Sequence, residues 1–268
     1  MVVFTNVKKE DVIKLKKLKF IPSAPKTVYE VIRYTKDGVT AILYESEKLL
    51  LQGKKESIDK VAELLERNGL GEKVKSQKFR KETGIIIGSD ESMKGDTFGG
   101  LVVAGVKADN KQRKELVEIG VNDSKKLSDK EIILMAETIR LIVPCIVKSL
   151  LPEEYNHNGK ITVMLNKLHQ ECADYLSPGQ HVVDKYPGCN VGDIREEKAE
   201  CKYVEVAAAS ILARAAALKQ FNYLSKMAGF NIPKGSTHVK IALQELKERN
   251  LDFNKFVKIS FSNVQEFL

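Results

Sequence analysis

A chain of 268 residues with 43% hydrophobic residues and a formal net charge of +8 has room for one large domain or two smaller ones, each with a buried core. No apolar run approaches the roughly 20 residues that span a bilayer, and the N-terminus lacks a signal-peptide layout, so we expect a cytoplasmic protein without membrane association. The four cysteines form no Cys-x-x-Cys pair, which argues against zinc and fits reduced thiols.

The first 70 residues have the pattern of a small α+β domain. Lys36-Asp37-Gly38 separates two apolar runs, and an Asp-Gly pair in that position indicates a β-hairpin. Apolar residues recur at helical spacing on both sides of the strands. The predicted elements are a Lys-rich helix over 8–19, strands over 28–34, 39–44 and 49–53, and a helix that Ser57 caps and that ends at Asn68-Gly69.

Residues 71–83 have the composition of a basic linker, and the positive charge of the chain is concentrated before and within it. Residues 1–81 hold 19 Lys and Arg against 11 Asp and Glu, a net of +8, whereas the remaining residues hold 25 of each. Such asymmetry is expected of a module that binds nucleic acid. A basic surface that only keeps the protein soluble is the alternative.

From residue 84 to residue 268, apolar strands and longer helical patterns mix. This arrangement indicates an α/β domain built around a central sheet. The predicted strands cover 84–89, 101–107, 143–148 and 181–184, and the predicted helices cover 128–141, 161–175, 204–218 and 237–248.

Two adjacent carboxylates, Asp90 and Glu91, stand between the predicted strands 84–89 and 101–107. Neighbouring side chains in a strand point to opposite faces, so we expect the strand to break into a turn here and let the two acids converge. Paired carboxylates suit a divalent metal, and metal-bound carboxylates commonly serve phosphoryl transfer. The alternative is a turn that is merely acidic.

Two further acids stand at the ends of predicted elements. Asp184 ends the strand 181–184, and Glu200 comes just before the alanine-rich helix that begins at 204. Taken alone, Glu200 is more typical of an ordinary surface residue. The alanines of the helix are equally explained by close packing on a sheet. Four acids at element ends in one domain, however, could converge on two metal ions.

Five groups of residues, in fixed order along the chain, resemble the motifs of type 2 ribonucleases H. They are Gly88-Ser89-Asp90-Glu91, Asn122-Asp123-Ser124-Lys125-Lys126-Leu127, Val183-Asp184, Lys198-Ala199-Glu200 and Ala207-Ala208-Ala209-Ser210-Ile211-Leu212-Ala213-Arg214. The chain resembles ribonuclease HIII more than HII, because Glu200 stands where HII has Asp. Four further segments are also similar to HIII, namely 152–156, 165–169, 233–236 and 261–263. The resemblance covers nearly the whole chain.

The resemblance implies a ribonuclease H-like catalytic domain with a central mixed sheet over 84–268, preceded by a TBP-like substrate-binding domain over 1–70. It implies that a monomeric enzyme hydrolyses the RNA strand of RNA–DNA hybrids and leaves 5′-phosphate and 3′-hydroxyl ends. Two Mg²⁺ or Mn²⁺ ions are implied as cofactors, and the implied catalytic residues and metal ligands are Asp90, Glu91, Asp184 and Glu200. Alternatives are an HII-like enzyme that incises at single ribonucleotides in DNA, and a catalytically silent hybrid-binding protein.

The implied substrate-binding residues fall in two segments. Ser124, Lys125 and Lys126 are implied to hold backbone phosphates. The family's turn after the acid pair reads Gly-Thr-Gly in HIII and Gly-Arg-Gly in HII, and is implied to approach the 2′-hydroxyls through its backbone. Here it reads Met93-Lys94-Gly95. Either the turn is shaped differently, or Met93 keeps a compatible φ and only its outward side chain differs.

Overall fold

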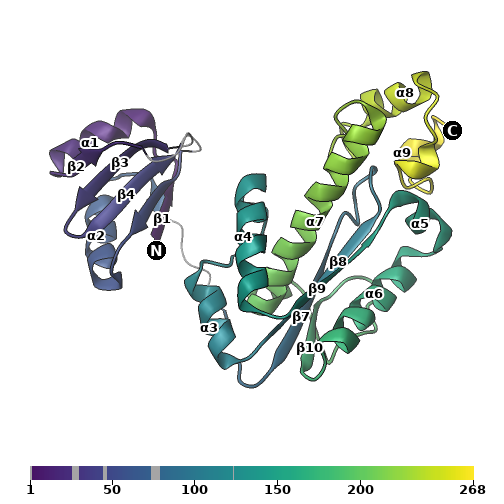
Figure 1. Ribbon diagram of the computed structural model, residues 1–268, viewed down its shortest axis with the longest axis horizontal. Helices are drawn as coiled ribbons and strands as arrows, with labels where there is room; N and C mark the ends of the chain where they lie inside the picture. Colours follow the sequence, from purple (N-terminus) through teal and green to yellow (C-terminus); the bar gives the residue numbers. More distant parts are fainter. Residues whose placement is uncertain (1, 26–29, 45–46, 74–78, 123) are drawn as a thin grey trace. The chain divides into compact units, whose positions relative to one another are not determined.

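The computed structural model describes residues 1–268 except 1, 26–29, 45–46, 74–78 and 123, and also leaves out the side chain of Lys126 (Figure 1). The chain divides into two compact units, residues 1–76 and 77–268. Each unit has its own hydrophobic core. The first two residues of the predicted strand 28–34 lie outside the described residues.

The first unit is a six-stranded antiparallel sheet with two helices. The strand order is β2-β3-β4-β5-β1-β6. Both helices contribute to one core with the sheet, where Leu15 and Val61 are buried with Tyr34 and Leu51. The elements are β1 (Val2–Thr5), α1 (Val12–Lys17) after a short 3-10 turn, β2 (Ile21–Ser23), β3 (Glu30–Lys36), β4 (Val39–Tyr44), β5 (Leu49–Gln52), α2 (Lys55–Arg67) and β6 (Glu72–Lys73).

The hairpin between β3 and β4 confirms the prediction made from Asp-Gly. Asp37 and Gly38 both have positive φ, at 50° and 75°, as a two-residue turn of this kind requires. The predicted cap of α2 is wrong. This helix begins at Lys55 with Lys54 at its N-cap, so Ser57 lies in the first turn. The helix begins earlier than predicted because only two residues separate it from the end of β5.

The segment predicted as a linker is divided between the two units. Glu72 and Lys73 pair with β1 as the edge strand of the first sheet. Arg80 belongs to the second unit, where its backbone N–H donates to the Lys202 carbonyl at 2.8 Å and its guanidinium pairs with Glu196 at 2.6 Å. Counted to the unit boundary, the first unit holds 16 basic and 11 acidic residues, a net of +5, which leaves +3 for the second.

The second unit has a five-stranded mixed sheet. The strand order is β11-β10-β7-β8-β9, in which β10 is parallel to β7 and β11 while β8 is antiparallel to β7 and β9. Its strands are β7 (Ile86–Ser92), β8 (Leu101–Ala108), β9 (Cys145–Leu150), β10 (Gln180–Asp184) and β11 (Ile194–Glu196). Its helices are α3 (Asn110–Glu118), α4 (Asp129–Ile142), α5 (Pro152–His157), α6 (Ile161–Leu176), α7 (Val204–Ala228), α8 (Lys240–Glu248) and α9 (Ser262–Gln265).

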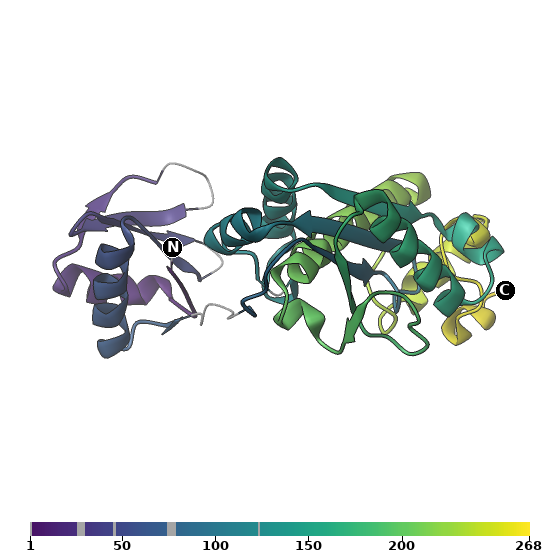
Figure 2. The ribbon, with the colours of Figure 1, turned by 90° about the horizontal axis from the view of Figure 1, so that it is seen from below.

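Helices cover both faces of this sheet. Along β8, Val102, Ala104 and Val106 pack with α7 and α4, whereas Leu101 and Val103 pack with α6. This alternation follows from the two-residue period of a strand. Figures 1 and 2 show that the C-terminal segment lies beside α5 at one end of the unit. None of the helices in the described part of the chain is long and apolar enough to cross a membrane.

Helix α7 packs directly on the centre of the sheet. Its residues from Val206 to Ala213 are all buried, and six of these eight are alanine, valine or serine, which lets the helix approach closely. A Cβ added to Gly88 on β7 would lie 2.4 Å from the backbone atoms Glu205 C and Val206 N. Only glycine therefore fits at this position of β7.

We expect Gly88→Ala to destabilise the second unit by about 3 kcal/mol, because the atoms nearest to an added Cβ are backbone atoms of α7, which cannot yield as a flexible side chain could. Chemical unfolding followed by circular dichroism measures the change. Gly95→Ala is the matched control, since a Cβ there meets no atom within 4 Å. Equal stability of the two variants would contradict this description of the contact.

Candidate active site

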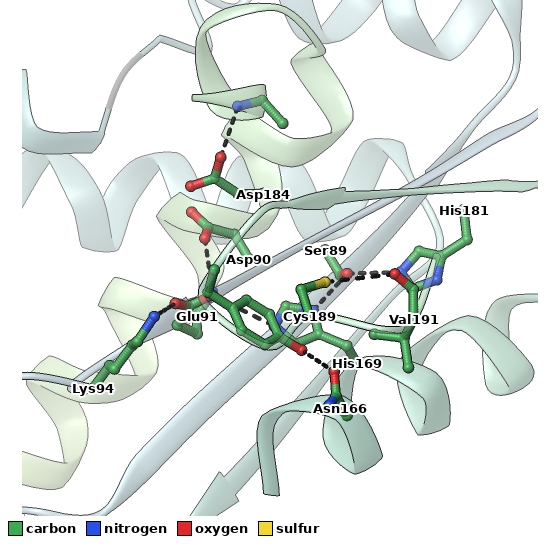
Figure 3. Close-up of polar contacts among 12 residues, drawn as sticks. Ser89, Asp90, Glu91, Lys94, Asn166, His169, His181, Asp184, Cys189 and Val191 are labelled. Carbon is green, nitrogen blue, oxygen red and sulfur yellow. Dashed lines mark hydrogen bonds and ion pairs between the residues drawn. The ribbon is translucent and has the colours of Figure 1, made fainter. Parts of the chain in front are cut away.

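The acid pair lies within a strand rather than in a turn. Strand β7 continues to Ser92, and Asp90 and Glu91 pair with Ala104 and Val103 of β8, so the prediction that the strand ends before the pair was wrong. The two side chains accordingly project to opposite faces. Asp90 accepts a hydrogen bond from Ser210 on α7. Glu91 faces His169 on α6 (Figure 3).

Asp184 lies beside Asp90 because their strands are parallel neighbours. Val183 of β10 pairs with Ser89 of β7, which brings the next residue of each strand together at the carboxyl end. In Figure 3 the two carboxyl groups point towards each other. Asp184 Oδ1 accepts a hydrogen bond from the Ala199 N–H at 2.8 Å. This bond attaches the 3-10 turn that carries the buried Glu200 to the end of β10.

Burial and neighbouring charges shift the pKa values of Asp90, Asp184 and Glu91. Burial, then the charges of Glu91 and Asp184, raise the pKa of Asp90 well above its usual value. Burial, opposed by the Ala199 N–H and aided by the charges of Glu200 and Glu91, raises the pKa of Asp184 to about 6. Burial also acts to raise the pKa of Glu91, but the contacts with His169 and Lys94 outweigh it and lower that pKa.

The carboxylates are turned towards protein partners. Asp90 Oδ1 accepts from the Glu91 N–H at 2.8 Å, Glu91 Oε1 is 3.2 Å from Lys94 Nζ, and Glu200 Oε1 is 3.5 Å from Lys125 Nζ. Within the described residues, no three His, Cys, Asp or Glu side chains form a ready-made metal cage.

The donor set nevertheless fits a hard divalent cation. All four groups are carboxylates, two of which are destabilised as anions by burial and mutual repulsion. Glu91 Oε2 is buried without a hydrogen bond in the described structure. Oxygen ligands of this kind are those that Mg²⁺ and Mn²⁺ prefer. The ion pairs that Glu91 forms with Lys94 and Glu200 forms with Lys125 involve lysines whose side chains are partly open to solvent.

A buried polar chain lies behind Glu91, and the sequence reasoning missed its function. Ser89 Oγ is 2.7 Å from both His169 Nδ1 and His181 Nε2, and His169 Nε2 is 3.5 Å from Glu91 Oε2 (Figure 3). Burial lowers the pKa of His181 to about 4. With the His181 ring neutral, its Nε2–H can donate to Ser89 Oγ, and the Ser89 hydroxyl can donate to His169 Nδ1. The chain thus places the ring of His169 beside the Glu91 carboxylate.

In the turn after the acid pair, Met93 has a backbone conformation compatible with that of a glycine. Met93 has a φ of 69°, the left-handed value that a glycine adopts without strain, so the backbone keeps a compatible shape. Its side chain does not point outward, as one alternative held, but is buried with 3% exposure. It occupies space beside Gly99, where an added Cβ would lie 1.9 Å from Met93 Cε.

The predicted phosphate-binding residues are placed differently from one another. Ser124 is buried and its Oγ is 2.9 Å from Ser210 Oγ, while its carbonyl accepts a hydrogen bond from Arg214, so its hydroxyl faces the protein interior. Lys125 is exposed beside Glu200. The side chain of Lys126 lies outside the described part of the structure. Of the three, Lys125 is the described cation next to the carboxylates.

Comparison with known proteins identifies the family of this chain. The family model described as Ribonuclease HII matches residues 87–264, which include all four carboxylates. A ribonuclease HIII from Bacillus cereus (strain 03BB102) is 32% identical over 267 residues, which cover 85% of this chain and 85% of the relative. The chain belongs to the ribonuclease HIII family. It is therefore a hydrolase of the ribonuclease H type, an endonuclease.

Solved structures show the same fold. Bst-RNase HIII in complex with Mn²⁺ is similar with a TM-score of 0.63 and 24% identity, over 99% of this chain and 97% of that one. RNase H3 from Aquifex aeolicus is similar with a TM-score of 0.58 and 26% identity, over 97% of this chain and all of that one. The mixed sheet of the second unit is therefore a ribonuclease H-like fold, as the sequence indicated.

In the metal-free protein, we expect the carboxyl of Asp184 to titrate with a midpoint near pH 6, because burial disfavours its charged form. A folded-state pKa above the unfolded value means that the contribution of this group to stability is present below about pH 4 and is lost as pH rises through about 6. NMR of labelled carboxyl carbons in EDTA measures the midpoint. Mg²⁺ is expected to lower it, and a metal-free midpoint near pH 4 would contradict the description.

Proposed function

We propose that this ribonuclease H cleaves the RNA strand of RNA–DNA hybrids with two divalent metal ions held by Asp90, Glu91, Asp184 and Glu200. The observation that carries the proposal is the meeting of Asp90 and Asp184 at the carboxyl ends of two parallel strands, with Glu91 next to Asp90 and with Glu200 in the turn that Asp184 holds through the Ala199 N–H. Such a cluster is unfavourable without cations and becomes favourable with them.

Each carboxylate has a place in the proposed site. Asp90, between Glu91 and Asp184, is positioned to serve both ions, while Glu200 and Asp184 are joined through the Ala199 N–H. When bound, Mg²⁺ or Mn²⁺ supplies Lewis-acid stabilisation of the phosphate and of the leaving oxygen. We propose 5′-phosphate and 3′-hydroxyl products. The Mn²⁺ complex of a structural relative supports a divalent metal.

Recognition of the hybrid is proposed to combine backbone donors and basic side chains. The backbone N–H groups of Lys94 and Gly95 have no hydrogen-bond partner among the described residues, and Gly95 is exposed. Such donors suit 2′-hydroxyls, which distinguish RNA from DNA. Lys125 is placed to contact a phosphate beside the carboxylates.

We propose that the first unit is a TBP-like substrate-binding domain. Its antiparallel sheet with two helices in one core and its net charge of +5 support this, as does a structural likeness that spans 99% of the chain.

We further propose that the protein is a monomer that works in the cytoplasm. All four cysteines are free thiols, as expected in a reducing compartment, and light scattering tests the monomer.

Asp184→Asn is expected to abolish cleavage, by at least 10³-fold in kcat, while the affinity for an RNA–DNA hybrid stays within about threefold, because the variant removes a charge and keeps the shape. Cleavage of a labelled hybrid and fluorescence anisotropy measure the two quantities. Asp174→Asn, an exposed carboxylate on α6, is the matched control and should retain activity. Undiminished cleavage by Asp184→Asn would contradict the proposal.

A second candidate function is incision at single ribonucleotides in DNA, which the altered turn at Met93-Lys94 keeps open. The same assay with a DNA duplex that contains one ribonucleotide separates the two. Faster cleavage of the full hybrid in both Mg²⁺ and Mn²⁺ supports the proposal, whereas preference for the single ribonucleotide supports the second candidate.

Removing residues 1–76 is expected to raise the KM for the hybrid at least tenfold and to flatten the dependence of binding on salt, because the slope of log K against log salt falls by about 0.9 for each phosphate that the protein no longer neutralises. The truncation keeps Arg80, which is bonded to Glu196 of the second unit. Anisotropy at several salt concentrations measures the slope. An unchanged slope would show that the first unit does not hold the substrate.

A further inference from the structure

A fully buried ammonium lies beneath the turn that follows the acid pair. Lys258 has no exposed surface, and its Nζ donates to the carbonyls of Met93 at 2.7 Å and of Asp96 at 2.5 Å. The rings of Tyr155 and Phe261 lie 5.3 and 5.2 Å from the same nitrogen, at cation–π distance. A cation from near the C-terminus therefore contacts both ends of the turn.

The contact with Met93 sets the direction of a donor on the other side of the turn. In a trans peptide, the carbonyl of one residue and the N–H of the next point in opposite directions. Since the Met93 carbonyl points inward to Lys258, the Lys94 N–H must point away from the protein interior. This N–H has no partner among the described residues, and neither has the N–H of the exposed Gly95.

Other bonds hold the remainder of the turn. Thr97 N–H donates to the Gly235 carbonyl at 3.0 Å, and Gly235 N–H donates to Asp96 Oδ1 at 2.5 Å. Lys258 N–H in turn donates to the Thr97 carbonyl at 3.0 Å. These bonds fix the end of the turn. The Met93 carbonyl accepts a hydrogen bond from the Asp96 N–H at 3.2 Å and a shorter one, at 2.7 Å, from Lys258 Nζ, so Lys258 supplies the side-chain contact that holds the Met93–Lys94 peptide.

The burial of the Lys258 ammonium costs free energy that a purely structural role does not require. Burying an ammonium without a paired carboxylate is unfavourable, and burial lowers the pKa of Lys258 to about 8 despite the opposing charge of Asp96. An apolar side chain would fill the same volume without this cost. It could not, however, satisfy two carbonyls at once or hold them both inward.

We propose that Lys258 is a positioning residue for the recognition of ribose: it orients the Met93–Lys94 peptide so that the N–H groups of Lys94 and Gly95 face the 2′-hydroxyls of the bound RNA strand. This inference rests on the proposed function and deepens it. Lys258 touches neither substrate nor metal and acts through the turn.

The test is Lys258→Met in the Asp184→Asn background, so that binding is measured without cleavage. Fluorescence anisotropy gives Kd for an RNA–DNA hybrid and for a DNA duplex of the same sequence. We expect Kd for the hybrid to rise about tenfold and Kd for the DNA duplex to stay within twofold. Lys255→Met makes the same chemical change at an exposed site three residues away and should alter neither value.

An unchanged ratio of the two Kd values in a folded Lys258→Met variant would overturn the proposal, whether neither affinity changes or both fall equally. Should this variant fail to fold, Lys258→Gln replaces it, because a neutral amide one bond shorter can reach only one carbonyl. A reduced ratio in Lys258→Gln supports the proposal and an unchanged one overturns it. If the Asp184→Asn protein itself binds both duplexes equally, the proposed function has failed, and not only the role of Lys258.

Discussion

The close contact between helix α7 and strand β7 is the constraint on which the active site depends. It is possible because Gly88 lacks a side chain and because the facing residues of α7 are small. With the helix at this distance, Ser210 reaches both Asp90 and Ser124, and Arg214 reaches the carbonyl of Ser124. One helix thus orients a carboxylate and the segment that precedes Lys125.

The charges of the site are compensated differently in the metal-free state and in the proposed metal-bound state. Without metal, Lys94 and Lys125 lie near Glu91 and Glu200, and burial favours protonation of Asp90 and Asp184. Under the proposed function, metal ions compete with these two lysines for the carboxylates.

The sequence predicted the elements whose signals are local. The hairpin through Asp37-Gly38 and strand β4 follow from turn residues and apolar runs, and the four acids follow from ordered motifs. What it missed depends on distant partners. The extension of β7 to Ser92 requires β8, and the inward path of Met93 requires the space beside Gly99. The roles of His169 and Lys258 likewise appear only when residues 80 to 165 positions apart meet.

The central claim is that Asp90, Glu91, Asp184 and Glu200 hold two metal ions together. Crystals of the protein grown with Mn²⁺ and a non-cleavable RNA–DNA hybrid test it most directly, because anomalous scattering locates manganese independently of the protein. The account predicts two peaks about 4 Å apart that are bounded by these four carboxylates. One peak, or peaks that Asp184 and Glu200 do not touch, would contradict it.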